Sequence, residues 1–111
     1  MISKETLLSA CKKRIEKVEV PLEGGHVFVK SMTAQERDDY EITAMEIGAK
    51  TFSRAMMVIF SACDKDGNLI FSSDDIEAVK NMDASIVQPI FNKALDLSYF
   101  TAEDIEELEK N

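Results

Sequence analysis

The sequence predicts an α+β fold in a single domain, residues 1–111. The fold is mostly helical, with five to six helices, a small antiparallel β-hairpin and a third short strand that can join it. Residues 15–20 and 26–30 alternate apolar and polar side chains on either side of a Gly-Gly turn, as the strands of a hairpin do. Residues 33–36 form a helix-starting capping box, and residues 52–63 are an almost unbroken apolar run. With 111 residues, 45% of them apolar, the chain is long enough for one modest core.

The first element is a helix predicted from Ser3 to about Arg14. Leu7, Leu8 and Cys11 give it an apolar side, and lysines gather toward its C-terminal end, where positive charge suits the helix dipole. The hairpin follows, with one face exposed to water. Because a lone hairpin is only marginally stable in water, we expect it to pack on the helices.

A second helix is predicted from Thr33 to about Ile47. The Thr33 hydroxyl can accept a hydrogen bond from the amide of Glu36, and the Glu36 carboxylate can reach back to the Thr33 amide. Gly48 is a natural stop for this helix. Its apolar face would carry Tyr40, Ala44 and Ile47.

Periodicity alone cannot tell whether the apolar run 52–63 is a buried helix or a buried strand. Its length, its Met and Ala content and its lack of internal Gly or Pro favour a central buried helix.

The next stretch nearly matches a calcium-binding EF-hand loop. Asp64, Asp66 and Asn68 fit loop positions 1, 3 and 5, but position 6 is Leu69 instead of Gly, and position 12 is Asp75 instead of Glu. The simpler interpretation is an Asp-Gly turn that leads into a short strand, residues 69–71, and places that strand on the hairpin. Calcium binding by Asp64, Asp66, Asn68 and Asp75 is the alternative.

Three helices are predicted after this turn. Ser72 or Ser73 would cap the first, which carries Ile76, Val79 and Met82 on one side. The second begins near residues 83–85, and Pro89 requires that it either start late or be kinked there. It has two apolar stripes, Ile86/Ile90/Ala94 and Val87/Phe91/Leu95. The last helix would begin at Thr101, with Ile105 and Leu108 facing inward.

The net charge of −8 is unevenly distributed. Residues 1–63 carry nine acidic and nine basic side chains, whereas residues 64–111 carry twelve acidic side chains against four lysines. The acidic half would repel a nucleic-acid backbone, so we expect no nucleic-acid partner. The acidic charge favours solubility. The acidic surface would either bind a basic partner or simply face the solvent. A small acidic inhibitor that mimics a nucleic acid is a further alternative.

Catalysis finds little support in the sequence, which predicts a non-enzymatic protein without cofactors. The only histidine, His26, stands at the start of a strand beside the Gly-Gly turn, and no paired Cys or His spacing suggests zinc. Cys11 and Cys63 fall among apolar positions and are predicted to be buried thiols. The N-terminus does not resemble a signal peptide and no apolar run could span a bilayer, so we expect a cytoplasmic protein without a membrane partner.

The sequence supports a function through interaction surfaces better than it supports catalysis. The open edges of the hairpin could accept a strand, and the apolar faces of the late helices could bind a helix or a second copy. The partner-binding residues we predict are Val87, Phe91 and Leu95.

An ordered set of segments resembles a known family. In chain order they are Val-Phe-Val-Lys-Ser-Met (27–32), Thr-Ala-Gln-Glu-Arg-Asp (33–38), the mid-chain apolar helix, Cys-Asp-Lys-Asp-Gly-Asn-Leu-Ile-Phe (63–71), Asp-Ile-Glu-Ala-Val (75–79) and the run 97–111. The set looks like the tail assembly chaperones of long-tailed bacteriophages and prophages.

The resemblance implies a non-enzymatic protein that binds the tape measure protein, keeps it soluble and helps recruit the tail tube protein. It also implies self-association and a place in the bacterial host cytoplasm, not in the mature virion. Many such proteins are also made in a longer, frameshifted form, of which this chain would be the shorter product.

Overall fold

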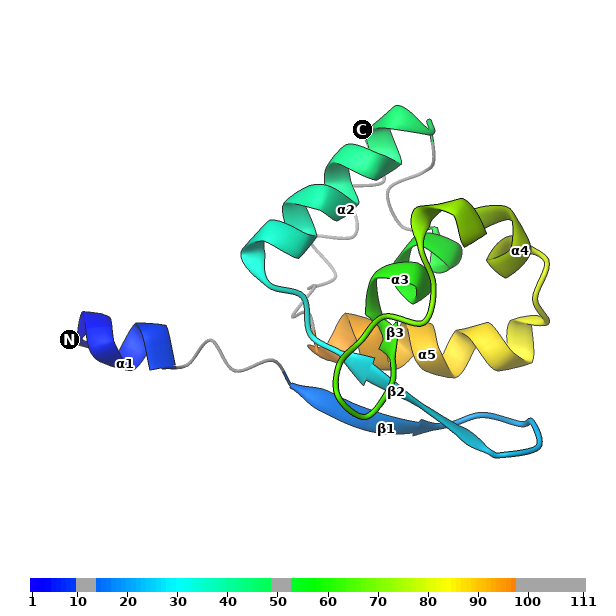
Figure 1. Ribbon diagram of the computed structural model, residues 1–111, viewed down its shortest axis with the longest axis horizontal. Helices are drawn as coiled ribbons and strands as arrows, with labels where there is room; N and C mark the ends of the chain where they lie inside the picture. The colour runs from blue at the N-terminus through cyan, green and yellow to red at the C-terminus, as the bar shows by residue number, and fades with distance from the viewer. Residues whose placement is uncertain (10–13, 49–52, 98–111) are drawn as a thin grey trace.

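The computed structural model describes residues 1–9, 14–48 and 53–97, and these residues confirm the mostly helical α+β fold (Figure 1). The elements are α1 (Lys4–Ser9), β1 (Ile15–Glu19), β2 (His26–Lys30), α2 (Ala34–Glu46), α3 (Arg54–Ser61), β3 (Ala62–Cys63), the 3-10 turn η1 (Ser73–Asp75), α4 (Ile76–Lys80) and α5 (Ala84–Leu97). The last predicted helix, from Thr101, lies outside the described residues.

The strands form an antiparallel sheet in the order β1-β2-β3. The hairpin has the predicted strands, and its register pairs Ile15 with Lys30 and Glu19 with His26. Val18 and Val29 are buried, whereas Lys17 and Glu19 are exposed, so the predicted water-facing side of the hairpin is present.

The third strand is not where the sequence placed it. Ala62 and Cys63, which precede the Asp-Gly turn, pair with β2, whereas Leu69 only bridges back to Cys63. The amide of Ile70 donates to the carbonyl of Ala62 at 3.0 Å. The turn reverses the chain, so the residues before it occupy the edge of β2 and residues 69–71 cannot also reach that edge. The predicted pairing of residues 69–71 with the hairpin is therefore wrong.

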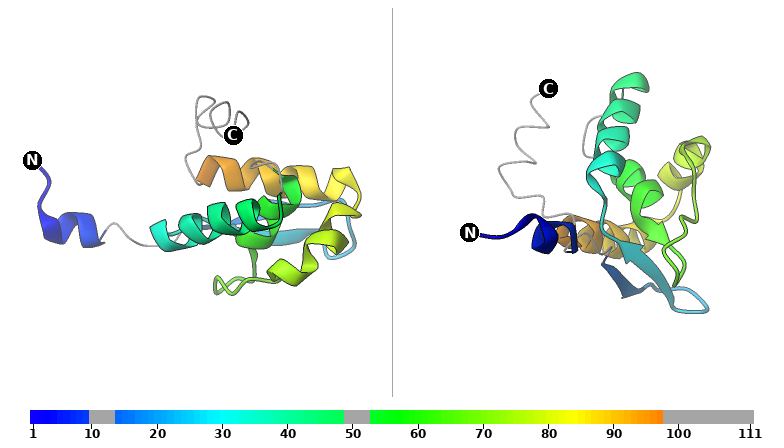
Figure 2. Two further views of the ribbon diagram at one scale, coloured as in Figure 1. Left: turned by 90° about the horizontal axis from the view of Figure 1, so that it is seen from above. Right: turned by 60° about the vertical axis from the view of Figure 1, so that its left-hand side comes forward.

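The predicted central helix is confirmed as α3, whose residues 55–59 are all buried. The helix ends at Ser61 because Ala62 adopts an extended backbone and carries the chain directly into β3. The buried Ser61 hydroxyl is satisfied because it donates to the carbonyl of Met57. Around α3 the core is built from α2, α4, α5 and β2, and α5 runs along the sheet (Figures 1 and 2).

The N-terminal helix is described over Lys4–Ser9, and the rest of its predicted range, residues 10–13, lies outside the described residues. None of its described residues is buried, and Leu7 and Leu8 are 58% and 62% exposed. Cys11 lies outside the described residues. Figures 1 and 2 show α1 standing apart from the body that the other elements form. An apolar face shows that a helix needs cover, but that cover need not come from the same molecule.

The capping box of α2 is confirmed. The Thr33 hydroxyl accepts from the amide of Glu36 at 3.1 Å, and the Glu36 carboxylate accepts from the amide of Thr33 at 3.0 Å. The second Glu36 oxygen pairs with the ammonium of Lys30, a side chain only 1% exposed at the end of β2. This ion pair ties the sheet to the start of α2.

The predicted apolar face of α2 is correct for two of its three residues. Tyr40 and Ala44 are buried, and burial raises the pKa of the Tyr40 hydroxyl. Ile47 is 47% exposed because it is the C-cap residue, where the helical periodicity ends. Gly48 has a φ of 64° and ends the helix as predicted.

The acidic half begins its helices at the predicted capping residues. The Ser72 hydroxyl caps η1, which continues into α4, and Ile76 and Val79 are buried. A carboxylate oxygen of Asp83 accepts from the amide of Ser85 at 2.9 Å and starts α5. The late start that Pro89 suggested is wrong, because α5 begins at Ala84 and continues through Pro89. The helix loses one backbone hydrogen bond at the proline, and we attribute its continuity to the burial of one side of α5.

Candidate functional site

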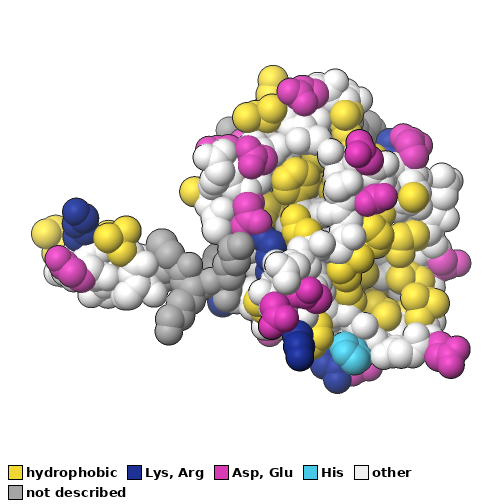
Figure 3. Space-filling model, in the orientation of Figure 1, with side chains coloured by type: hydrophobic (Ala, Val, Ile, Leu, Met, Phe, Trp, Pro, Cys, Tyr) yellow, Lys and Arg dark blue, Asp and Glu magenta, His cyan; other side chains and the backbone are white. Residues whose placement is uncertain are grey.

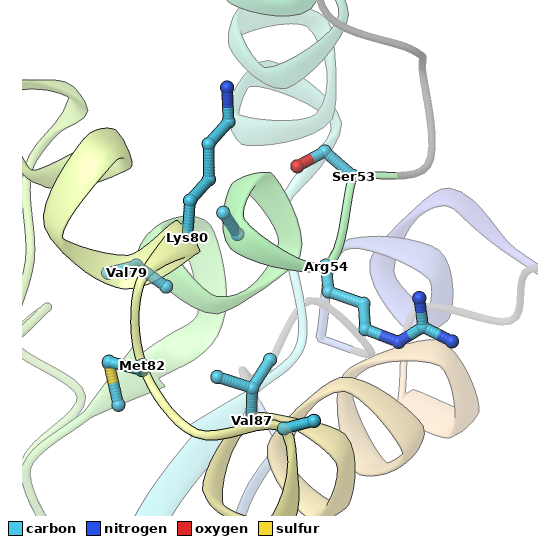
Figure 4. A pocket seen from close by; sticks show the side chains of 8 residues that line it. Ser53, Arg54, Val79, Lys80, Met82 and Val87 are labelled. Atoms are coloured by element: carbon cyan, nitrogen blue, oxygen red, sulfur yellow. The ribbon is translucent and has the colours of Figure 1, made fainter.

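Two apolar grooves share Met82 on the described surface. The first, called the helical groove, has a volume of about 220 Å³ where α3, α4 and α5 converge (Figure 4). Its lining residues are Ser53, Arg54, Ala55, Val79, Lys80, Met82, Ala84 and Val87. The second, called the hairpin groove, has a volume of about 200 Å³. It is lined by Val20, Leu22, Glu23, Gly24, Gly25, His26, Val27, Ala62, Ile70, Phe71, Met82, Ile86 and Ile90.

Local folding explains how the helical groove arises. Ser53 caps α3 by accepting from the amide of Met56, so the first turn of α3 faces the first turn of α5. The short α4 ends at Lys80, and the three-residue path over Asn81, Met82 and Asp83 brings α5 directly beside it. Because these segments turn sharply, their apolar side chains cannot fill the space between them completely.

The helical groove has an apolar floor and two basic side chains at its rim. Val79 and Val87 are buried at its base, while the exposed side chains of Arg54 and Lys80 come from different helices (Figure 4). Lys80 pairs with Glu77 at 3.4 Å across an exposed surface. A surface ion pair of this kind is worth little, so Lys80 can exchange it for another carboxylate.

Arg54 also covers a predicted partner-binding residue. Its Nε donates to the side-chain oxygen of Gln88 at 2.6 Å, and its guanidinium carbon lies 5.3 Å from the centre of the Phe91 ring. Gln88 in turn donates to the side-chain oxygen of Asn92 at 2.8 Å. The guanidinium therefore lies over an aromatic ring that would otherwise be more open to water.

The three predicted partner-binding residues have different surroundings. Val87 lines the helical groove although it is only 5% exposed, Phe91 is half-buried under Arg54, and Leu95 is half-buried against the core. The structure brings Val87 and Phe91 together on one side of α5. Partner binding by all three residues remains a prediction.

Sequence reasoning missed the basic rim. Arg54 directly follows the Ser53 cap and opens an otherwise apolar helix, which was an available signal. Nothing in the sequence pattern relates Arg54 to Lys80, because Arg54 begins α3, Lys80 ends α4, and β3 and η1 lie between the two helices.

The near-EF-hand stretch is organised by its own backbone. One Asp64 oxygen accepts from the amides of Asp66 and Asn68, at 2.8 and 3.0 Å, and the other accepts from the Asn68 side chain at 3.2 Å. The bond from the Asn68 amide is the main reason that the pKa of Asp64 is lowered. Asp75 instead accepts from the amide of Ser72 at 2.8 Å, so it caps a separate turn. Within residues 1–9, 14–48 and 53–97, no group of three His, Cys, Asp or Glu side chains is arranged to hold a metal ion.

The remaining residues with reactive side chains have structural surroundings. His26 is exposed and lies edge-on to Phe28, with ring centres 5.6 Å apart. Cys63 is a buried thiol, as predicted. None of the helices in the described part of the chain is long and apolar enough to cross a membrane.

Comparisons with known proteins agree with one another. A family model described as "Phage tail assembly chaperone" matches residues 12–111. A solved structure titled "Structure of bacteriophage HK97 tail assembly chaperone" matches with a TM-score of 0.59 and 22% sequence identity. The match covers 89% of this chain and 99% of that one, and at this identity it supports the fold alone. No curated protein matches the sequence closely enough to add to these findings.

Proposed function

Since this chain belongs to the phage tail assembly chaperone family, we propose that it acts by binding and not by catalysis. Its client would be the tape measure protein, whose apolar helical stretches it would cover while the tail tube assembles. The tail tube protein would be the second partner, and copies of the chain would associate with one another. The work would take place in the bacterial host cytoplasm, and the mature virion would not contain the protein.

The observation that carries this proposal is the helical groove. A helix binds in a groove by inserting side chains that project from one face, three or four residues apart. A volume of about 220 Å³ is the size of one or two large apolar side chains, and the floor at Val79, Met82 and Val87 is chemically suited to them. Phe91, one turn beyond Val87, would extend the contact if Arg54 moved aside.

The basic rim adds a preference for the flanks of the client. Arg54 and Lys80 would meet carboxylates that border the inserted apolar side chain, so acidic residues next to a Leu or Phe would favour binding. Because both side chains are exposed, they would contribute more to orientation and association rate than to affinity.

Filling the groove tests the proposal without disturbing the core. Ala84 lines the helical groove and is exposed at the start of α5, so Ala84→Phe would occupy the space that a client side chain needs. We expect this variant to lose at least tenfold in the amount of tape measure fragment that it co-purifies and keeps soluble. Ala78→Phe is the matched control, because Ala78 is exposed on α4 and does not line the groove.

The outcomes separate client binding from this particular groove. If the unaltered protein does not keep the fragment soluble, the proposed function is wrong. If both phenylalanine variants act like the unaltered protein, the client binds elsewhere.

A further inference from the structure

We propose that β1 of one copy pairs with β1 of a second copy, antiparallel and centred on Val18, so that the two sheets join into one. This inference rests on the self-association included in the proposed function, and it gives that association a specific surface. It does not involve the helical groove, so its test is independent of client binding.

The sheet leaves one side of β1 open among the residues that the structure describes. The sequence left both edges of the hairpin free to accept a strand, but β3 pairs with Phe28 and Val29 at the edge of β2. The opposite edge of the sheet is the outer side of β1, Ile15–Glu19, and no described strand pairs with it. The backbone groups of such an edge can bond to a further strand.

The pairing of the hairpin shows which backbone groups of β1 point to this edge. One step beyond the end of the register, the amide of Val20 donates to the carbonyl of Gly25 at 2.9 Å. Bonded and unbonded positions alternate along an antiparallel strand, so the even-numbered residues of β1 bond to β2. The amides and carbonyls of Ile15, Lys17 and Glu19 therefore point away from β2, toward the open edge.

The side chains of Lys17 and Glu19 are exposed on the water-facing side of the hairpin. Neither charged group forms an ion pair with another described residue, whereas Glu16 on the other face lies 3.9 Å from Lys93. Figure 3 shows acidic and basic side chains gathered at the lower edge of the body, next to the histidine. That histidine, His26, is the register partner of Glu19. The edge thus presents one free positive and one free negative charge.

Charge selects one register for a symmetric pair of β1 strands. When a two-fold axis relates two antiparallel strands of one sheet, the central residue lies opposite its own copy. Centring the pair on Glu16, Lys17 or Glu19 would place like charges directly opposite each other, which is destabilising. Centring it on Val18 instead places Lys17 opposite Glu19 of the second copy, on both sides of the axis.

The same register satisfies the backbone and the core face. Lys17 and Glu19 both present outward groups, so the two facing pairs together can form about four backbone hydrogen bonds. Val18, which is buried on the side of the sheet that packs against α5, would lie beside its own copy and continue the apolar layer. Charges on an edge strand usually block pairing, but in this register each charge meets its opposite.

Sedimentation velocity of the full chain over a dilution series tests the contact. Lys17→Glu would place two acidic side chains opposite each other, and Glu19→Lys would do the same with two lysines. We expect each variant to weaken self-association roughly tenfold or more. Glu46→Lys is the matched control, because Glu46 is exposed at the end of α2, far from β1 (Figure 1). Circular dichroism should show that the variants stay folded.

Two combinations should restore association if the strands meet in this register. In an equimolar mixture of Lys17→Glu and Glu19→Lys chains, a pair with one chain of each kind has opposite charges at both facing positions. A chain that carries both changes also has opposite charges there and keeps the net charge of the unaltered protein. We expect both combinations to return to within about threefold of the unaltered association constant.

Proline distinguishes strand pairing from a contact between side chains alone. Lys17→Pro removes an outward-facing amide, and an edge strand tolerates this change because the bonds of β1 to β2 remain. Lys17→Ala is its control, since it removes the same charge and keeps the amide. We expect Lys17→Pro to associate more weakly than Lys17→Ala by roughly tenfold, the cost of two lost backbone bonds.

Each result decides one part of the inference. If neither single charge variant weakens association, the copies meet through another surface and the inference is wrong. If both weaken it and neither combination restores it, the register centred on Val18 is wrong. If folded Lys17→Pro associates as well as Lys17→Ala, the contact is not strand pairing. If the unaltered protein stays monomeric at every concentration, self-association and this inference both fail, while co-purification with the tape measure fragment still decides client binding.

Discussion

The helices α1 and α3 both carry large apolar side chains, but the folded chain buries them only in α3. In α3, residues 55–59 are buried against α2, α4 and α5, whereas α1 has no buried residue. The difference is one of connection, since α3 continues directly into β3 and is held at the centre of the sheet and helices. Apolar content thus predicts which segments need cover, and only topology decides whether the same chain supplies it.

The largest effect should come from truncating α3. Met57 is fully buried, so Met57→Ala should lower the free energy of unfolding by about 3 kcal/mol through lost burial and a residual cavity. Urea unfolding measures this change. Leu7→Ala in α1 is the matched substitution and should cost less than about 0.5 kcal/mol at concentrations where the chain is monomeric. If Met57→Ala and Leu7→Ala lowered the free energy of unfolding equally, the difference in burial between α3 and α1 would have no effect on stability.

A somewhat smaller effect should follow from breaking the Lys30–Glu36 pair. Glu36→Gln would leave the Lys30 ammonium buried without a counter-charge, and we expect a loss of about 2 kcal/mol in the free energy of unfolding. Lys30→Met with Glu36→Gln should recover much of this loss, because no unpaired charge then remains. If the double variant were no more stable than Glu36→Gln, desolvation of Lys30 would not be the cause.

A loss of about 1–2 kcal/mol is expected for Gly67→Ala. Gly67 has a φ of 88°, and an added Cβ would lie 3.1 Å from Cδ1 of Ile15 at the start of β1. Gly24→Ala is the control, since Gly24 has a φ of 94° with open space around it and carries only the backbone cost. Unfolding free energies should therefore differ between the two variants. Equal values would mean that the turn does not press on β1.

The smallest expected effects concern Asp64. Hydrogen bonds, first of all the one from the Asn68 amide, hold its pKa below the usual range of an aspartate carboxyl. Its contribution to stability is therefore present above that range and is lost as the pH falls through the lower folded-state pKa. Thermal unfolding at pH 5 and pH 2.5 should show a smaller loss on acidification for Asp64→Asn than for the unaltered chain. If Asp64→Asn and the unaltered chain lost the same stability on acidification, Asp64 would not be the source of this pH dependence.

Calcium gives Asp64 a second, independent test. Titration calorimetry with millimolar calcium should give no binding heat, because Asp64 and Asp75 already accept backbone hydrogen bonds in separate turns. Binding heat that disappears in Asp64→Ala would restore the calcium alternative.

Much of the fold could be predicted because its signals are local. The hairpin follows from alternation around Gly24–Gly25, the start of α2 from Thr33 and Glu36, and the start of α5 from Asp83. The third strand could not be placed, because residues 62–63 read as the end of an apolar helix and only the reversal at Gly67 fixes which side of the turn meets β2. The late start of α5 that Pro89 suggested was wrong, because the effect of a proline depends on how much of the helix is buried elsewhere.

The candidate grooves were less accessible to sequence reasoning. The α5 stripe was visible in the pattern, but its relation to Arg54 and Lys80 depends on how three helices converge. The hairpin groove likewise combines a turn near residue 22 with a loop near residue 70 and the side of α5.

One contact at the edge of the body joins residues that are far apart in the sequence. The Arg14 guanidinium donates to the carbonyl of Leu97 at 2.7 Å, and the Arg14 backbone is held by Ser31. The two ends of the segment 14–97 therefore lie side by side. A short tether from residue 97 to residue 14, with new ends opened at the hairpin turn, would close only a small loop and should leave the core intact. Such a permuted chain would lack residues 1–13 and 98–111, and would report separately what residues 14–97 do on their own.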